Sequence, residues 1–142
     1  MSHELQNDIA RFAAEAVAQL TERAGGALDF SPASLHHVEE ILGEASACRA
    51  ELSDEIVSTL VERLGCYVLE VARREFGGEY FWHDTEQPVL VVGEPAFHVA
   101  LTAWEKVRSR LNGDASDNLP FHYAGFAQRA RSAEPGMRVL FV

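Results

Sequence analysis

Residues 53–92 read SDEIVSTLVERLGCYVLEVARREFGGEYFWHDTEQPVLVV, and the spacing of the apolar residues changes partway through them. In the first part, apolar side chains recur every three or four positions, which predicts a helix that begins after the N-cap residue Ser53 and extends to residue 76. Two glycines end this helix. The period then falls to two, so residues 79–83 and 87–92 are predicted to be the strands of a hairpin.

The predicted helix carries Ile56, Leu60, Leu64 and Val68 on one face. Such a stripe is typical of a helix that packs against the core, and we expect Leu60, Leu64 and Val68 to be nearly inaccessible. Gly65 lies in the middle of the helix, where a glycine costs about 1 kcal/mol relative to alanine. Close packing of another element against Gly65 is the expected compensation.

Two further helices are predicted on the N-terminal side of this stretch. Residues 3–24 carry an apolar stripe at helical spacing, and Gly25 and Gly26 are expected to end that helix. Residues 31–47 begin with a serine N-cap followed by proline at the first helical position. They too place apolar residues three and four apart, so we expect a second amphipathic helix.

On the C-terminal side, alternating residues predict a third strand over residues 96–101, and helical spacing returns from Trp104 to Leu111. A last helix is expected to begin at an N-cap provided by Ser116 or Asp117. A final strand is predicted over residues 137–142. The fold is therefore predicted to be α+β, with three N-terminal helices, a three-stranded antiparallel meander, two helices and a C-terminal strand that joins the sheet.

The composition is that of an ordinary globular domain, with 142 residues of which 47% are hydrophobic and 24% charged. No repeat or linker divides the chain, so residues 1–142 are predicted to form a single domain. The formal charge of −10 argues against binding to nucleic acid or to an anionic membrane, because both need a basic surface. Residues 1–62 hold 12 acidic residues and three arginines, so the acidity belongs to the N-terminal half.

Compartment signals favour a cytoplasmic protein of bacterial type. The N-terminal residues are interrupted by charges and lack the apolar segment of a secretory signal. The longest uncharged apolar run, residues 64–69, is far shorter than the roughly 18 residues that cross a bilayer. Cys48 and Cys66 are expected to be reduced thiols, since no disulfide framework is present, and Cys66 is expected to be buried and unreactive.

Three short motifs carry a family resemblance. They are Leu-Gly-x-Tyr at residues 64–67, Gly-Gly-x-aromatic at residues 77–80, and the helix end KVRSRLNG at residues 106–113. With these motifs the chain resembles a group of small uncharacterised bacterial domains, over about residues 28–126. The resemblance implies a fold and a bacterial origin, and it brings no activity, cofactor or catalytic residue with it.

One helix face has the residue types of a metal site. His36 lies three and four positions before Glu39 and Glu40, which places a nitrogen and a carboxylate on the same face. The alternative to a metal site is that these residues lie on a solvent-exposed helix face, because the sequence provides no third ligand at a fixed spacing. The chain also lacks a Walker loop, GxGxxG, GxSxG and paired-cysteine zinc motifs. We therefore expect neither a metal nor a cofactor.

The predicted hairpin gathers Trp82, His83, Asp84 and Glu86. A histidine beside carboxylates could act as a general base with an orienting partner. Neighbouring strand residues point to opposite faces, however, so Trp82 and His83 are not expected to share one pocket. Partial burial of the aromatic residues and a partner-binding patch are the alternatives.

An enzyme acting on a small molecule would need a pocket where His83, His98 or His122 meets Asp84 or Glu94. His98 and His122 lie in apolar stretches, where a hydrogen-bonded core histidine is the alternative. A concave pocket that holds two or more of these histidines would favour an enzyme, and a large flat apolar patch would favour assembly.

The leading interpretation is a non-catalytic protein-interaction module, similar to an immunity or adaptor protein, whose acidic helical face meets a basic protein partner. The alternatives are a small-molecule-binding protein or enzyme with a histidine/carboxylate pocket, and a structural homodimer. The expected partner-binding residues are Glu39, Glu40, Glu44, Glu51 and Glu55, together with Trp82 and His83 of the hairpin.

Overall fold

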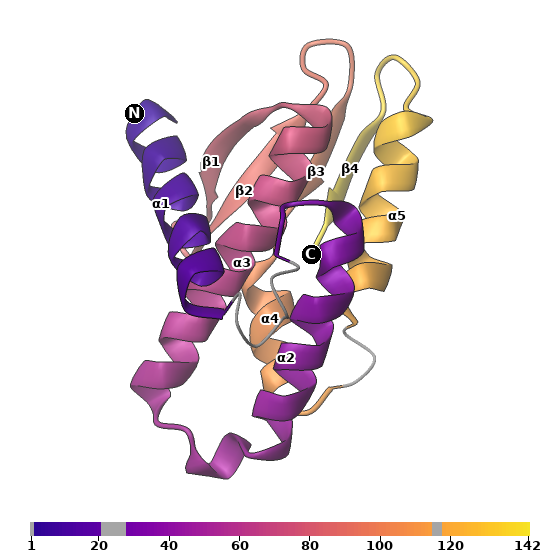
Figure 1. The fold of residues 1–142 in the computed structure, drawn as a ribbon. Coiled ribbons are helices and arrows are strands. Elements are labelled where there is room, and N and C mark those ends of the chain that lie inside the picture. The colour runs from indigo at the N-terminus through magenta and orange to yellow at the C-terminus, as the bar shows by residue number, and fades with distance from the viewer. Residues whose placement is uncertain (1, 21–27, 115–117) are drawn as a thin grey trace.

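A four-stranded sheet and five α-helices make up the part of the chain that the computed structural model describes, residues 2–20, 28–114 and 118–142 (Figure 1). The helices are α1 (Ser2–Leu20), α2 (Leu35–Ala47), α3 (Asp54–Phe76), α4 (Trp104–Leu111) and α5 (Leu119–Arg131), and two short 3₁₀ segments, η1 (Pro32–Ser34) and η2 (Arg49–Glu51), flank α2. The strands are β1 (Glu79–His83), β2 (Gln87–Val92), β3 (His98–Leu101) and β4 (Arg138–Phe141). This is the predicted order, and the α+β class is confirmed.

The strands follow one another in the sheet in the order β1-β2-β3-β4. The pairs β1/β2 and β2/β3 are antiparallel, as expected of a meander, whereas β4 joins β3 in the parallel direction. Paired residues share a face of the sheet, so the register defines two faces. The inner face carries Tyr80, Leu90 and Leu101, which lie in the core.

The core lies between the inner face of the sheet and the helices. Helix α3 is its spine, since α1, α4 and α5 as well as strand β2 all contact it. Leu64 and Val68 are fully buried, as predicted. The prediction is wrong for Leu60, which is only partly buried, and Ile56 on the same face is 48% exposed.

The length of α3 explains the exposure at its beginning. Its 23 residues extend for about 35 Å, whereas the longest strand has six residues and spans about 20 Å. The first turns of α3 therefore project beyond the sheet toward the η2 connection, at the lower end of Figure 1. Apolar spacing alone does not show where along a helix the covering elements end.

Side chains cap three of the helical segments. The Ser53 side chain accepts a hydrogen bond from the Ile56 amide at the start of α3. The Ser31 side chain accepts one from the Ser34 amide in η1. The N-cap of α5 is Asn118, whose side chain accepts from the Phe121 amide. The caps predicted for α5 and the glycines predicted to end α1, namely Ser116, Asp117, Gly25 and Gly26, lie outside the described residues.

Gly65 allows α4 to pack closely on α3. A Cβ atom placed on Gly65 would lie 2.3 Å from Cδ1 of Trp104, which is inside any normal contact distance. The glycine is therefore required by a neighbouring side chain, which is the close packing expected at this position.

The Gly65→Ala variant is expected to lower the free energy of unfolding by about 1 to 3 kcal/mol, because overpacking against Trp104 outweighs the gain of about 1 kcal/mol in helix propensity. Urea denaturation followed by circular dichroism measures this change. Gly43→Ala on α2 is the matched control, since its Cβ would meet only the flexible end of Arg110 at 3.2 Å. If both alanines stabilise the protein equally, the Trp104 contact does not require a glycine.

Candidate functional site

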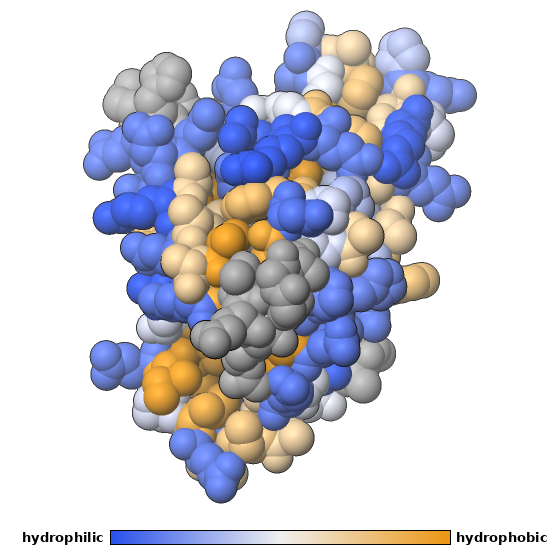
Figure 2. All heavy atoms as spheres, viewed as in Figure 1, coloured by the Kyte–Doolittle hydropathy of each residue, from blue (hydrophilic) through white to orange (hydrophobic). Residues whose placement is uncertain are grey.

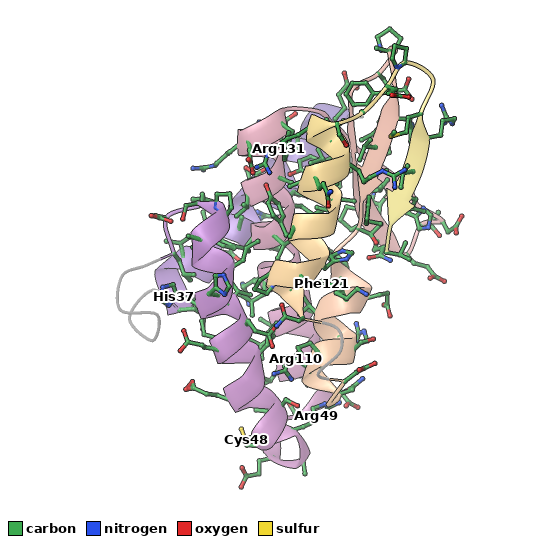
Figure 3. All side chains as sticks on the ribbon, turned by 90° about the vertical axis from the view of Figure 1, so that its right-hand side faces the viewer. His37, Cys48, Arg49, Arg110, Phe121 and Arg131 are labelled. Carbon is green, nitrogen blue, oxygen red and sulfur yellow. The ribbon has the colours of Figure 1, made fainter. Side chains whose placement is uncertain are left out.

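The outer face of the sheet is the strongest candidate site. We give this name to the side chains that the strand register directs away from the helices. Its apolar members line a hollow of about 550 Å³ that is open to solvent; they are Phe81, Val89, Val91, Ala100 and Leu140. Figure 3 views the molecule from the side and shows the described helices on one side of the sheet, so that none of them covers the hollow.

The floor and the walls of this hollow differ in exposure. Val89, Val91 and Ala100 are buried and form an apolar cluster that is separate from the main core. Phe81 and Leu140 stand beside them and are 48% and 44% exposed. Large apolar side chains at this exposure, over an apolar floor, are typical of a surface that a partner covers.

Charged groups border one end of the outer face. Nδ1 of His98 lies 2.6 Å from Oε2 of Glu94, and Nη1 of Arg138 lies 3.6 Å from the same oxygen. A smaller hollow of about 360 Å³ continues from here, and Glu79 and Glu94 line it together with Phe81. The outer face therefore has an apolar centre and a polar border.

Two of the three candidate histidines, His83 and His98, line the same hollow, which meets the condition set for an enzyme, but they lie toward its two ends. His83 lines the hollow at the hairpin end of β1, whereas His98 lines it beside the loop between β2 and β3. In the register, Glu79 lies opposite the end of β2 that leads into this loop, and His83 lies at the other end of β1. The two ends are four strand residues apart, which is about 13 Å. His122 is buried in the core, where Nε2 lies 2.9 Å from the Thr102 carbonyl oxygen.

His98 and Glu94 do meet, as the enzyme hypothesis required, and the pair could accept and orient a proton. The described lining of the two hollows contains no serine, threonine, cysteine, lysine or tyrosine that could serve as a nucleophile. The groups on the outer face can thus contact apolar groups, exchange hydrogen bonds at its border and, at the His98–Glu94 pair, accept a proton.

Glu39, one of the expected docking residues, is engaged inside the protein. Its Oε2 accepts a hydrogen bond from Nε of Arg110 on α4, and its Oε1 accepts from the Leu119 amide, 3.1 Å away at the start of α5. The side chain is 17% exposed. Glu39 therefore holds three helices together and presents little charge to a partner.

The other acidic candidates are exposed and lie away from the outer face. Glu40 and Glu44 lie on α2, and Glu51 and Glu55 lie in and just after the η2 connection. Figure 1 places this connection at the opposite end of the molecule from the loop between β2 and β3. These four residues form the acidic end of the molecule, a name we keep below.

Trp82 and His83 lie on opposite faces of β1, as expected. Trp82 packs edge-on against Trp104 of α4, with ring centroids 6.4 Å apart, and is 53% exposed. His83 belongs to the outer face, and its Nε2 lies 3.7 Å from Oδ2 of Asp84. Of the seven expected partner-binding residues, His83 is the one that lines the apolar hollow.

The helical side of the molecule has its own apolar surface. Figure 2 shows hydrophilic side chains around the edge of this side, and apolar ones through its middle and at its lower end, where α2 and α3 are connected. Ile56 is the large hydrophobic residue most exposed there. Ile56 does not line any of the hollows described for this structure, so this surface is a weaker candidate.

The two cysteines are free thiols. Cys66 is buried, and burial raises the pKa of its thiol to about 12, which keeps it protonated and unreactive. Cys48 is partly exposed at the end of α2.

Within residues 4–20, 28–114 and 118–142, no group of three or more histidine, cysteine, aspartate or glutamate side chains is placed to hold a metal ion. None of the described helices is both long and apolar enough to cross a bilayer.

Comparisons with protein-family models, with curated proteins and with solved structures gave no match. The resemblance to small bacterial domains therefore stays a prediction, and the geometry of this chain is what bears on its function.

Sequence reasoning missed Phe81, Leu140 and the apolar centre of the outer face. A signal was present in strand β2, whose sequence QPVLVV is apolar on both faces instead of alternating. A strand of this kind is covered on both sides or lies next to a surface that a partner covers. Which of the two applies here depends on where the helices pack.

Proposed function

We propose that this protein is a non-catalytic interaction module that binds a basic protein partner through the outer face of its sheet. The observation that supports this most strongly is the half-exposure of Phe81 and Leu140 over an apolar floor that no described element covers. The centre of a protein interface is typically apolar and aromatic, and its rim is polar. The outer face has this arrangement, with Glu94, His98 and Arg138 on its border.

The charge of the chain supports a basic partner. At a formal charge of −10, the protein attracts a cationic surface over distances of about 8 Å in physiological salt. A second copy of the chain would carry the same charge and be repelled, so the homodimer is less favoured by this argument. The acidic end would then contribute to the rate of encounter, and the outer face would provide the contact itself.

The Phe81→Ser variant tests the docking surface, and Phe121→Ser is its matched control. Phe121 lies on α5, labelled in Figure 3, and is 78% exposed, so both variants lose one exposed aromatic ring. We expect Phe81→Ser to weaken binding by about tenfold or more, as at a hot spot, and Phe121→Ser to leave it unchanged. Proteins captured from a bacterial lysate by the wild type and by each variant are identified by mass spectrometry, and the affinity is then measured with the purified partner.

A basic partner that is retained by Phe121→Ser and lost by Phe81→Ser supports the proposal. Reversing Glu40 and Glu44 to Lys should in addition slow association at low salt and leave dissociation nearly unchanged. Equal binding by all variants would contradict the outer-face site. If the protein instead captures a second copy of itself, the outer face is a homodimer interface and not the site of a basic partner.

A further inference from the structure

Strand β4 forms an open edge of the sheet next to the outer face. It pairs with β3 on one side, and no described strand pairs with its other side. Figure 3 shows β4 with no helix in front of its free side. The opposite edge of the sheet, strand β1, is different because α1 lies beside it (Figure 1).

The parallel ladder determines which backbone groups of β4 remain unpaired. The His98 amide donates to the Met137 carbonyl oxygen at 2.7 Å, and the Thr102 amide donates to that of Phe141 at 2.9 Å. Residues 137, 139 and 141 therefore direct their backbone groups toward β3. Alternate residues must direct theirs away, so the N–H and C=O groups of Arg138 and Leu140 point outward along the edge.

The same two residues contribute side chains to the outer face. Arg138 pairs with His98 in the register, and Leu140 pairs with Ala100, whose side chain lies on the floor of the hollow. A chain that pairs with Arg138 and Leu140 would therefore place its own alternate side chains beside the hollow. Free backbone groups and an apolar face thus meet at one edge.

We propose that the partner supplies an extended segment that adds to β4 as a fifth strand, with apolar residues at every second position facing the outer face. This inference rests on the proposed function and specifies how the basic partner is recognised. Main-chain hydrogen bonds provide affinity in such strand addition, and alternate side chains provide specificity. A docked helix would contact the hollow but would leave the amides of Arg138 and Leu140 without partners.

The Leu140→Pro variant tests strand addition on the protein side. Proline removes the N–H that points outward and removes none of the hydrogen bonds to β3, so the native sheet should form. Leu140→Ala is the matched control, because it keeps the N–H and shortens the side chain. Thermal denaturation of both variants checks that they are folded.

The probe is a synthetic peptide of 12 residues, chosen from a random phage-displayed library by selection on the wild-type protein at low salt. We expect enriched sequences that alternate apolar with other residues and include lysine or arginine. Binding should weaken by about tenfold or more in Leu140→Pro and by a smaller factor in Leu140→Ala.

Methylating the backbone nitrogens of the peptide tests the same hydrogen bonds without altering the protein, so it decides the matter if Leu140→Pro does not fold. Methylation at one set of alternate positions should abolish binding, and methylation at the other set should be tolerated. Strand addition is wrong if both sets are tolerated, if no peptide is enriched, or if Leu140→Pro binds like the wild type.

The outcomes separate this inference from the proposed function. If Phe81→Ser loses the basic partner and Leu140→Pro retains it, the outer face is the docking surface and strand addition is overturned. If the wild type sediments as a dimer and Leu140→Pro as a monomer, a second copy occupies the edge, which overturns the basic partner.

Discussion

Replacing Leu64 by Ala is expected to lower the free energy of unfolding by about 2 to 5 kcal/mol, which is a large part of the stability of a small domain. Leu64 is fully buried at the middle of α3, within a cluster that contains residues of every helix. Truncation removes apolar surface and leaves a cavity that the helices on each side cannot fill without moving. Urea denaturation, with an unchanged dependence on denaturant, measures the loss.

Ile56→Ala is the control for this prediction, because Ile56 lies on the same face of α3 but is 48% exposed. Its truncation should cost less than about 1 kcal/mol, as exposed positions usually do. Equal losses for the two variants would mean that α3 is not buried in the way described above.

Glu70 is the second residue whose substitution is expected to lower the free energy of unfolding by a large amount. Its carboxylate is buried on α3 and accepts hydrogen bonds from the Tyr80 hydroxyl at 2.7 Å and from Nε and Nη2 of Arg73 at 2.7 and 3.0 Å. Burial by itself would raise the pKa of this carboxyl, but the hydrogen bonds from Arg73 and Tyr80 outweigh it and hold the pKa below its usual value. The group connects the core helix to strand β1 in its ionised form.

Glu70→Ala is expected to cost about 3 to 5 kcal/mol, because it leaves the buried Tyr80 hydroxyl without an acceptor and removes the charge that faces Arg73. The double variant Glu70→Leu with Tyr80→Phe should lose less, since both polar partners are replaced together. Chemical denaturation of the single and double variants gives the comparison. A double variant as unstable as Glu70→Ala would assign the loss to packing and not to the unpaired hydroxyl.

The stabilisation from Glu70 should also depend on pH. Because the pKa in the folded protein lies below that of the unfolded chain, which is about 4.3, ionised Glu70 stabilises the fold at neutral pH. This contribution is lost as the pH falls from about 5 through the folded pKa. The difference in stability between the wild type and Glu70→Gln should therefore shrink at acid pH, and a constant difference would contradict the role of the charge.

Local signals were sufficient for most of the secondary structure. The strands Glu79–His83 and Gln87–Val92 and the helix Trp104–Leu111 have the bounds predicted from the sequence. Caps, glycines and apolar periods act over a few residues, so they are readable without knowledge of the neighbours. The need for a close neighbour at Gly65 was readable in the same way, although the identity of that neighbour, Trp104, was not.

The candidate site was less accessible to sequence reasoning. Glu39 was expected on a docking face, but its partners are 71 and 80 residues away in the chain, at Arg110 and the Leu119 amide. Contacts at such separations depend on how the helices pack, and a helical spacing cannot distinguish an acid that faces solvent from one that faces another helix.

The sequence by itself determined the helices and strands, their order, the α+β class and the acidic character of the N-terminal half. Tertiary structure alone decided that the described helices gather on one side of the sheet, which leaves Phe81 and Leu140 half-exposed on the other, and that Glu39 is used internally. The physical reason is that backbone preference and periodicity are properties of neighbouring residues, whereas burial is a property of the residues that meet across the whole fold.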